Sequence, residues 1–223
     1  MSRNANEDGA QDAGLEVFGR IAASVSHEFN NVITIIGEVN GLLEDMLLLA
    51  ERGHEPEMDK LRGQCARIGK QVRRGRDIIK QLNRFAHRVD SVRTEIDLNE
   101  VAENTVALAR RAFEMRRIEL DFAPAAEPVL LTSSPFRVQE LLFHVLDAFL
   151  DPEQSGGSVE LAIGEEDASV RISIRAEVCR AACSRSLEAA HQLATALGGH
   201  IAADEEDGGP VAIQLMLPRH KGL

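Results

Sequence analysis

The chain has 223 residues, of which 44% are hydrophobic, so it can bury one sizeable core or two small ones. Its formal net charge is −11 at pH 7. A chain this acidic is repelled at long range by nucleic acids and by anionic membranes, so the composition excludes a general binder of either. We expect no nucleic-acid partner and no membrane partner.

The first residues, MSRNANEDGAQDAG, are polar and acidic. They lack the basic and apolar regions of a signal peptide, so we expect no export, a cytoplasmic location and a disordered segment over 1–14. The leucine run MLLLA at 46–50 is too short to cross a bilayer. The chain has three cysteines, Cys65, Cys179 and Cys183, an odd number that fits no zinc spacing. We expect them to be incidental thiols, and we expect no metal site.

Apolar residues early in the chain recur every three or four positions, the pattern of an amphipathic helix with one apolar seam. The seam consists of Phe18, Ile21, Val25, Phe29, Val32, Ile36, Val39, Leu43, Met46 and Ala50. The pattern predicts a helix over about residues 14 to 52. Gly53 and Pro56 then predict a turn, because glycine permits a sharp reversal and proline suits the first turn of a new helix.

The same spacing resumes from Met58 to Val89, which predicts a second helix antiparallel to the first. Two helices alone cannot shield seams of this length, whereas two hairpins packed together form a four-helix bundle with a closed core. We therefore predict a homodimer, with the bundle domain over 15–92.

From residue 93 onward, short strands alternate with helices. We predict helices over about 98–115, 135–150 and 184–197, and strands at IELDFA, VLL, SVELAIG, SVRISIRA, HIAAD and PVAIQLML. The predicted fold class is α+β: a long antiparallel helical hairpin, followed over 93–223 by an α/β sandwich with helices on one side of a mixed sheet.

The stretch SVSHEFNN places His27 on the side of the first predicted helix that faces away from the seam. At 100° per residue, His27 lies about 200° around the helix from the seam residue Val25. Asn31 and Thr34 share its polar face, and Glu28 lies beside it. A partner can therefore reach all four residues at once.

Imidazole is nucleophilic at neutral pH when one nitrogen is unprotonated and an acceptor holds the other. Glu28 would supply that acceptor, and Asn31 would orient a water molecule at a phosphoryl group. Most exposed histidines do nothing of this kind, so the spacing alone leaves an ordinary surface histidine as an open alternative. The other histidines lack such neighbours and are expected to be structural or solvated: His54, His87, His144, His191, His200 and His220.

A partner at His27 would also touch the neighbouring turns of the same helix. We assign these turns to partner docking through Arg20, Ser24, Thr34, Ile35, Glu38 and Leu42. The second helix is basic within an acidic chain, and Arg73, Arg74 and Arg76 are assigned to attracting an acidic partner. Solvation of an exposed bundle face is an equally open explanation of these charges.

These segments resemble those of a known family. ASVSHEFNNVITIIGE is similar to the H-box of sensor histidine kinases, with His27 at the phospho-acceptor position, Glu28 at the adjoining acid and Asn31 at the position linked to phosphatase activity. IDLNEVAENTVALARRAFEMRRIELDFAP resembles the entry to their ATP-binding domain, RVQELLFHVLDAFLD their N-box helix, and LEAAHQLATALGGHIAADEEDGGPVAIQLMLP their last helix and strands. The resemblance implies a dimerisation and histidine-phosphotransfer bundle followed by a GHKL-type ATPase fold.

The chain departs from the family pattern at the nucleotide site. Asp147 stands where the family has an asparagine for magnesium, and Phe143, which offers no cation ligand, stands at a second asparagine position. The stretch AEVCRAAC replaces a D-x-G-x-G loop, and Ser186 replaces a glycine of the G-x-G-L-G loop. Glycines in such loops let backbone N–H groups approach phosphates, so we predict that ATP binding is lost. Gly198 and Gly199 remain, most simply as a helix cap.

These observations predict a histidine phosphotransferase of a two-component phosphorelay, which moves a phosphoryl group between His27 and receiver-domain aspartates without using ATP. The resemblance implies response-regulator receiver domains as partners, which would hold Mg²⁺ themselves, and no cofactor in this chain. The chain thus resembles dimeric histidine phosphotransferases with a degenerate kinase fold. Three alternatives stay open: a response-regulator phosphatase, a divergent sensor histidine kinase, and a non-catalytic dimeric adaptor of a response regulator.

Overall fold

The structure is a computed structural model that describes residues 2–55, 57–89, 93–150, 155–166, 168–177, 184–204 and 211–219. The chain divides into two compact units. One covers Ala22–Asn83 and is a helical hairpin, and the other covers Arg84–Leu223 together with Met1–Ile21.

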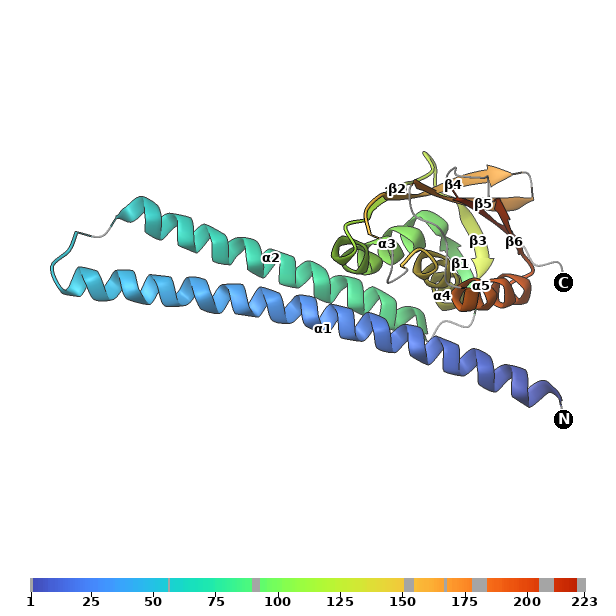
Figure 1. Cartoon of the computed structure of the whole chain (residues 1–223), viewed down its shortest axis with the longest axis horizontal. Helices are drawn as coiled ribbons and strands as arrows, with labels where there is room; N and C mark the ends of the chain where they lie inside the picture. The colour runs from blue at the N-terminus through green and yellow to red at the C-terminus, as the bar shows by residue number, and fades with distance from the viewer. Residues whose placement is uncertain are drawn as a thin grey trace. The chain divides into compact units, whose positions relative to one another are not determined.

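Two long helices run antiparallel: α1 spans Ser2–Glu51 and α2 spans Met58–Val89 (Figure 1). Both agree with the predicted helices except at the start of α1, which the sequence places near residue 14. Residues 2–14 were expected to be disordered because they are polar and acidic, but they are helical in the structure. No proline interrupts the chain before Glu51, so nothing in the backbone ends the helix earlier.

The predicted seam holds the hairpin together. Val25, Val32 and Val39 of α1 are almost completely buried, as is Ile78 of α2. Gly75 of α2 marks a close approach, because a Cβ added there would lie 3.4 Å from Val32 Cγ1 and 3.6 Å from Phe29 Cε2. The turn between the helices uses Gly53 at φ 88°, a conformation that favours glycine.

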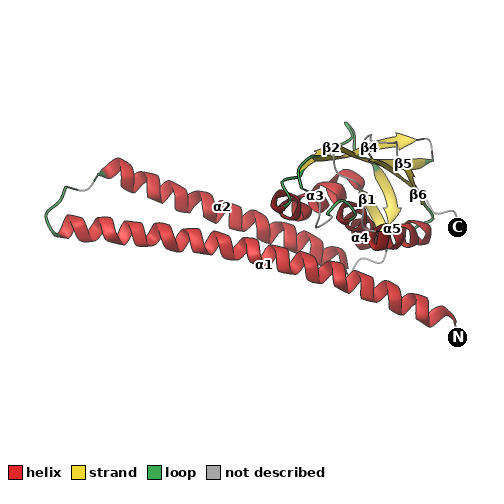
Figure 2. Cartoon of the chain, viewed as in Figure 1, coloured by secondary structure: helices red, strands yellow, loops and turns green. Residues whose placement is uncertain are grey.

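The α/β unit contains two sheets (Figure 2). A short antiparallel pair joins β1 (Thr94–Asp97) to β3 (Leu130–Ser133). The larger sheet has the order β2-β4-β5-β7-β6, with β2 parallel to β4 and the other neighbours antiparallel. Its strands are β2 Glu119–Ala123, β4 Ser158–Glu166, β5 Ser169–Glu177, β6 His200–Asp204 and β7 Val211–Pro218.

Three helices cover one face of the five-stranded sheet: α3 Leu98–Met115, α4 Pro135–Asp147 and α5 Ser184–Ala196 (Figure 1). The core lies between this helical layer and the inner face of the sheet, and it includes the fully buried Phe113, Phe149 and Ile172. Burial alternates along β5, as the sequence pattern VRISIRA predicts. The predicted fold class is therefore confirmed.

Side-chain caps position the helices. Asp97 caps α3, since its Oδ1 accepts hydrogen bonds from the backbone N–H groups of Asn99 and Val129 at 3.0 and 3.2 Å. Ser134 caps α4 by accepting from the Arg137 N–H at 3.4 Å. The short strand β1 ends at Asp97 and was not predicted, because TEID has only four residues and a single apolar side chain.

Gly198 and Gly199 end α5, in agreement with the cap expected from the sequence. Gly198 adopts φ 82°. A Cβ at Gly199 would overlap the carbonyl oxygen of Met216 on β7, so only glycine fits at that close approach. Gly198 and Gly199 therefore have a role in ending the helix and in packing that does not depend on a bound nucleotide.

Several sequence-based expectations fall partly outside the described residues. The predicted domain boundary at 92/93 adjoins residues 90–92, and Cys179 and Cys183 lie in 178–183, all outside the described ranges. Cys65 is an exposed free thiol. Within the described part of the chain, no cluster of three or more His, Cys, Asp or Glu side chains is arranged to hold a metal ion. None of the helices described there is both long and apolar enough to span a membrane.

Candidate functional site

His27 lies on the outer side of α1 and is exposed. The seam residues Val25 and Val32 are buried on the opposite side, as the helical spacing predicts. The apolar seam thus orients α1 so that the imidazole is accessible to another molecule.

Asn31, one turn further along α1, is the hydrogen-bonding neighbour of the His27 ring. Its Nδ2 lies 3.4 Å from His27 Nδ1, a long contact for a hydrogen bond. The amide can also present its oxygen to Nδ1, and it then accepts the Nδ1 proton and leaves the lone pair on Nε2. With Nδ1 occupied by Asn31, Nε2 is the ring nitrogen available to a partner.

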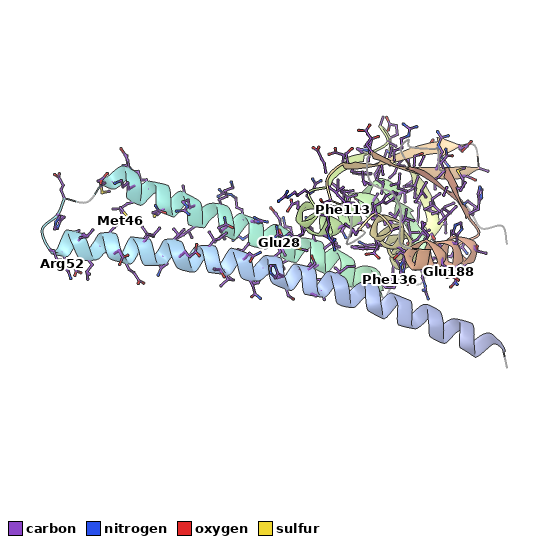
Figure 3. The ribbon with its side chains drawn as sticks, viewed as in Figure 1. Glu28, Met46, Arg52, Phe113, Phe136 and Glu188 are labelled. Carbon is purple, nitrogen blue, oxygen red and sulfur yellow. The ribbon has the colours of Figure 1, made fainter. Side chains whose placement is uncertain are left out.

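Glu28 does not take the place expected for it beside the imidazole. Its Oε1 accepts hydrogen bonds from Arg74 Nη2 at 2.9 Å and from Arg74 Nε at 3.3 Å. Figure 3 labels Glu28 on α1, at the level where α2 runs alongside. The hydrogen bond to Nδ1 assigned to Glu28 by sequence is therefore made by Asn31 instead. An ion pair across the hairpin outweighs a contact between neighbouring residues, because adjacent helical side chains diverge by about 100°.

The predicted docking residues follow one side of α1. Thr34, Glu38 and Leu42 are exposed, whereas Ser24 and Ile35 are half-buried. Together with His27 they extend over roughly 27 Å of helix at 1.5 Å per residue. The side chain of Arg20 lies outside the described side chains. These residues therefore share a side of the helix, and their role in docking remains a prediction.

The three arginines assigned to one basic surface do not share one face of α2. Arg73 and Arg76 differ by about 60° around the helix, whereas Arg74 lies about 160° from Arg76. Arg74 turns to Glu28, as the ion pair shows. Sequence reasoning missed this pairing because it requires the register of the hairpin, which the seam at Gly75 sets and charge counting does not.

In the α/β unit, two of the positions that depart from the family pattern touch each other. Ser186 Oγ at the start of α5 donates a 2.6 Å hydrogen bond to Asp147 Oδ2 at the end of α4. Phe143, one turn before Asp147, packs against the hydrophobic core. Residues 178–183, which include most of AEVCRAAC, lie outside the described residues.

A buried carboxyl group also lies on α4. The Glu140 side chain is fully buried, and its Oε2 accepts a 3.0 Å hydrogen bond from Arg137 Nη1. Burial raises the pKa of Glu140 above its ordinary value of 4.5, and the nearby guanidinium of Arg137 opposes part of that rise. The Glu140 carboxyl group is thus buried while Arg137 stays partly exposed, and both residues belong to a different unit from His27.

Comparison with solved structures finds histidine kinases. A histidine kinase from Burkholderia phymatum STM815 superposes with a TM-score of 0.51 at 13% identity, covering 91% of this chain and 99% of that chain. The histidine kinase AdeS of Acinetobacter baumannii superposes with a TM-score of 0.50 at 13% identity, covering 87% and 98%. No protein-family model and no curated protein sequence matches the chain.

The chain therefore has the fold of histidine kinases, with a helical hairpin followed by an ATPase-type α/β sandwich. The resemblance recognised in the H-box and N-box stretches is confirmed at the level of the fold.

Proposed function

We propose that this protein is a histidine phosphotransferase, which exchanges a phosphoryl group between His27 and the aspartates of response-regulator receiver domains. The observation that carries the proposal is the exposed imidazole of His27, whose Nδ1 is held by Asn31 and whose Nε2 is open to a partner. The long polar side of α1 around it supports docking of a second protein.

The chemistry needs little from this chain. The lone pair on His27 Nε2 forms the N–P bond, the P–O bond to the receiver aspartate breaks, and the aspartate carboxylate leaves with the electron pair. Nδ1 keeps its proton, and an Asn31 amide turned with its oxygen toward Nδ1 would accept it. The receiver domain supplies Mg²⁺ to stabilise the transferring group. Transfer in the opposite direction follows the same steps in reverse.

The residues described at the former nucleotide site fit ATP and Mg²⁺ poorly. The Asp147 carboxylate is engaged by Ser186 and carries a negative charge that would repel a triphosphate. Phe143, at the other asparagine position, offers no oxygen ligand. We therefore propose that ATP is not the phosphoryl donor.

We also propose that the protein acts as a homodimer through the hairpin. Among the exposed large apolar side chains described on the hairpin, five repeat with heptad spacing along their helix: Ile33 and Leu47 on α1, and Met58, Val72 and Ile79 on α2. With the register set by Gly75 against Val32, helical geometry puts all five on the same face. A second copy offers the same stripe, so a two-fold pairing would bury both in a four-helix bundle.

The experiment is transfer of label from a phosphorylated receiver domain. We expect label on the wild type and on His54→Ala, which removes another exposed histidine, and none on His27→Ala. Transfer that persists in His27→Ala would overturn the proposal. Loss of receiver phosphate without label on the protein would favour a phosphatase, and receiver binding without any transfer would favour an adaptor. Autophosphorylation with ATP and Mg²⁺ would favour a kinase.

A further inference from the structure

Arg74 of α2 is bound to the carboxylate that follows His27 in the sequence. Both Nη2 and Nε of Arg74 donate to Glu28 Oε1, at 2.9 and 3.3 Å. The Glu28 side chain is 24% exposed and that of Arg74 is 50% exposed. Charge-assisted hydrogen bonds of this kind hold a carboxylate more firmly than neutral ones do. Glu28 is therefore directed at α2, and its charge is balanced there.

The close approach at Gly75 makes this contact possible. Gly75 lies against Val32 and Phe29, the residue after Glu28, and it directly follows Arg74. The two helices thus approach each other closely at the level of the ion pair. A bulky residue at position 75 would push the helices apart and lengthen the bond between Arg74 and Glu28.

The charge of Glu28 matters to any phosphoryl group that approaches His27. Such a group is anionic, and an unbalanced carboxylate one residue away would repel it. Coulomb repulsion between like charges grows as they approach and is stronger at a protein surface than in bulk water. A guanidinium bound to that carboxylate removes most of this repulsion.

The geometry points to Arg74 as a positioning residue of the transfer site, which holds the Glu28 carboxylate against α2 and cancels its charge so that an anionic phosphoryl donor can reach Nε2 of His27. Arg74 then acts on α1 of its own hairpin, and not as part of a basic surface with Arg73 and Arg76. The inference deepens the proposed function, because it concerns the same histidine.

The test uses two small reagents of different charge on the whole protein. Phosphoramidate is an anionic donor: His27 Nε2 forms the N–P bond, the P–N bond of the reagent breaks, and ammonia leaves. Diethyl pyrocarbonate is a neutral acylating reagent for the same nitrogen. At about pH 8.5, where histidine side chains are neutral, Arg74→Gln should slow phosphorylation of His27 roughly tenfold and leave acylation unchanged. If the substitution instead reduced the exposure of His27 or disturbed the fold, both phosphorylation and acylation of His27 would be slower.

Two further variants serve as controls. Arg74→Lys keeps the positive charge and should retain most of the phosphorylation rate, whereas Lys70→Gln removes an exposed charge one turn away on α2 and should have little effect. Equal rates of phosphorylation in the wild type and Arg74→Gln, or equal slowing of both reagents, would overturn the inference. This assay contains no receiver domain. It therefore tests the role of Arg74 independently of the proposed function, which is overturned when receiver domains fail to label His27.

Discussion

Ser186 Oγ donates a 2.6 Å hydrogen bond to Asp147 Oδ2 and so joins the first turn of α5 to the end of α4. Hydroxyl-to-carboxylate bonds of this length are charge-assisted and stronger than neutral hydrogen bonds. Both residues stand at positions that the resemblance to histidine kinases assigns to the nucleotide site, and in this structure they form a contact between two helices.

Ser186→Ala should lower the free energy of unfolding by about 1–3 kcal/mol, because a buried hydroxyl bonded to a carboxylate is lost. Thr195→Ala on the same helix is the matched control, since its Oγ1 makes an exposed hydrogen bond to the His191 carbonyl at 2.9 Å. Denaturant unfolding of both variants measures the difference. Equal destabilisation by the two substitutions would contradict the assignment.

The proposed loss of ATP binding is tested by calorimetric titration with a non-hydrolysable ATP analogue and Mg²⁺. We expect no heat of binding for the wild type, since Asp147 opposes the triphosphate charge and Phe143 supplies no ligand. Titration of an active histidine kinase domain under the same conditions verifies the assay. Saturable binding at micromolar concentrations would show that a nucleotide site persists.

Most of the fold could be predicted from the sequence, because its signals are local. The seam from Val25 to Val39 has helical spacing, β5 alternates strictly, and Pro135 marks the start of α4. The predicted start of α1, near residue 14, was wrong. Residues 2–14 carry no apolar pattern, and a helix can continue through them without one. The strand β1 was missed because it is short and depends on pairing with β3.

The candidate site could be predicted only in part. The exposure of His27 follows from its position relative to Val25 on one helix. The ion pair of Glu28 with Arg74 could not be predicted in this way, because Arg74 lies on the other helix and the register of the hairpin brings it to Glu28. For the same reason, the bond between Ser186 and Asp147 joins helices that are far apart in the sequence.

Burial of Glu140 predicts a pH-dependent contribution to stability. Its folded-state pKa lies above the ordinary value of 4.5, so the folded protein holds this proton more tightly than the unfolded chain does. The contribution is fully present below about pH 4.5 and is lost as pH rises through the folded-state pKa.

Glu140→Gln cannot ionise, so the variant should gain stability relative to the wild type as pH rises from about 4 to 7. Denaturant unfolding across this range measures the difference, and Glu188→Gln, at an exposed position of α5, provides the control (Figure 3). A difference that stays constant, or that shrinks with rising pH, would refute a raised pKa at Glu140.

Gly75 should tolerate alanine but not a large side chain. A Cβ there makes ordinary contacts with Val32 and Phe29, and alanine favours the helix by about 1 kcal/mol over glycine. Gly75→Leu should instead overpack the seam and destabilise the hairpin by about 1–3 kcal/mol. Thermal unfolding followed by helical circular dichroism distinguishes the two, and a leucine variant as stable as the alanine variant would show that the helices are not closely packed at Gly75.

The proposed dimer predicts different results for two adjacent leucines on α1. Leu47 lies about 80° around the helix from the buried seam residue Val39, on the exposed apolar face, whereas Leu48 lies about 180° from Val39. Their exposures are similar, at 57% and 48%, so the substitutions are matched in residue type and environment.

A charge at position 47 would be buried between the two copies, at a cost of several kcal/mol. Leu47→Glu should therefore raise the dimer dissociation constant by about 100-fold or more, and Leu48→Glu should leave it nearly unchanged. Sedimentation equilibrium over a range of protein concentrations measures both. Dimers that dissociate equally in the two variants would place the interface elsewhere on the hairpin, and a monomeric wild type would exclude the four-helix bundle.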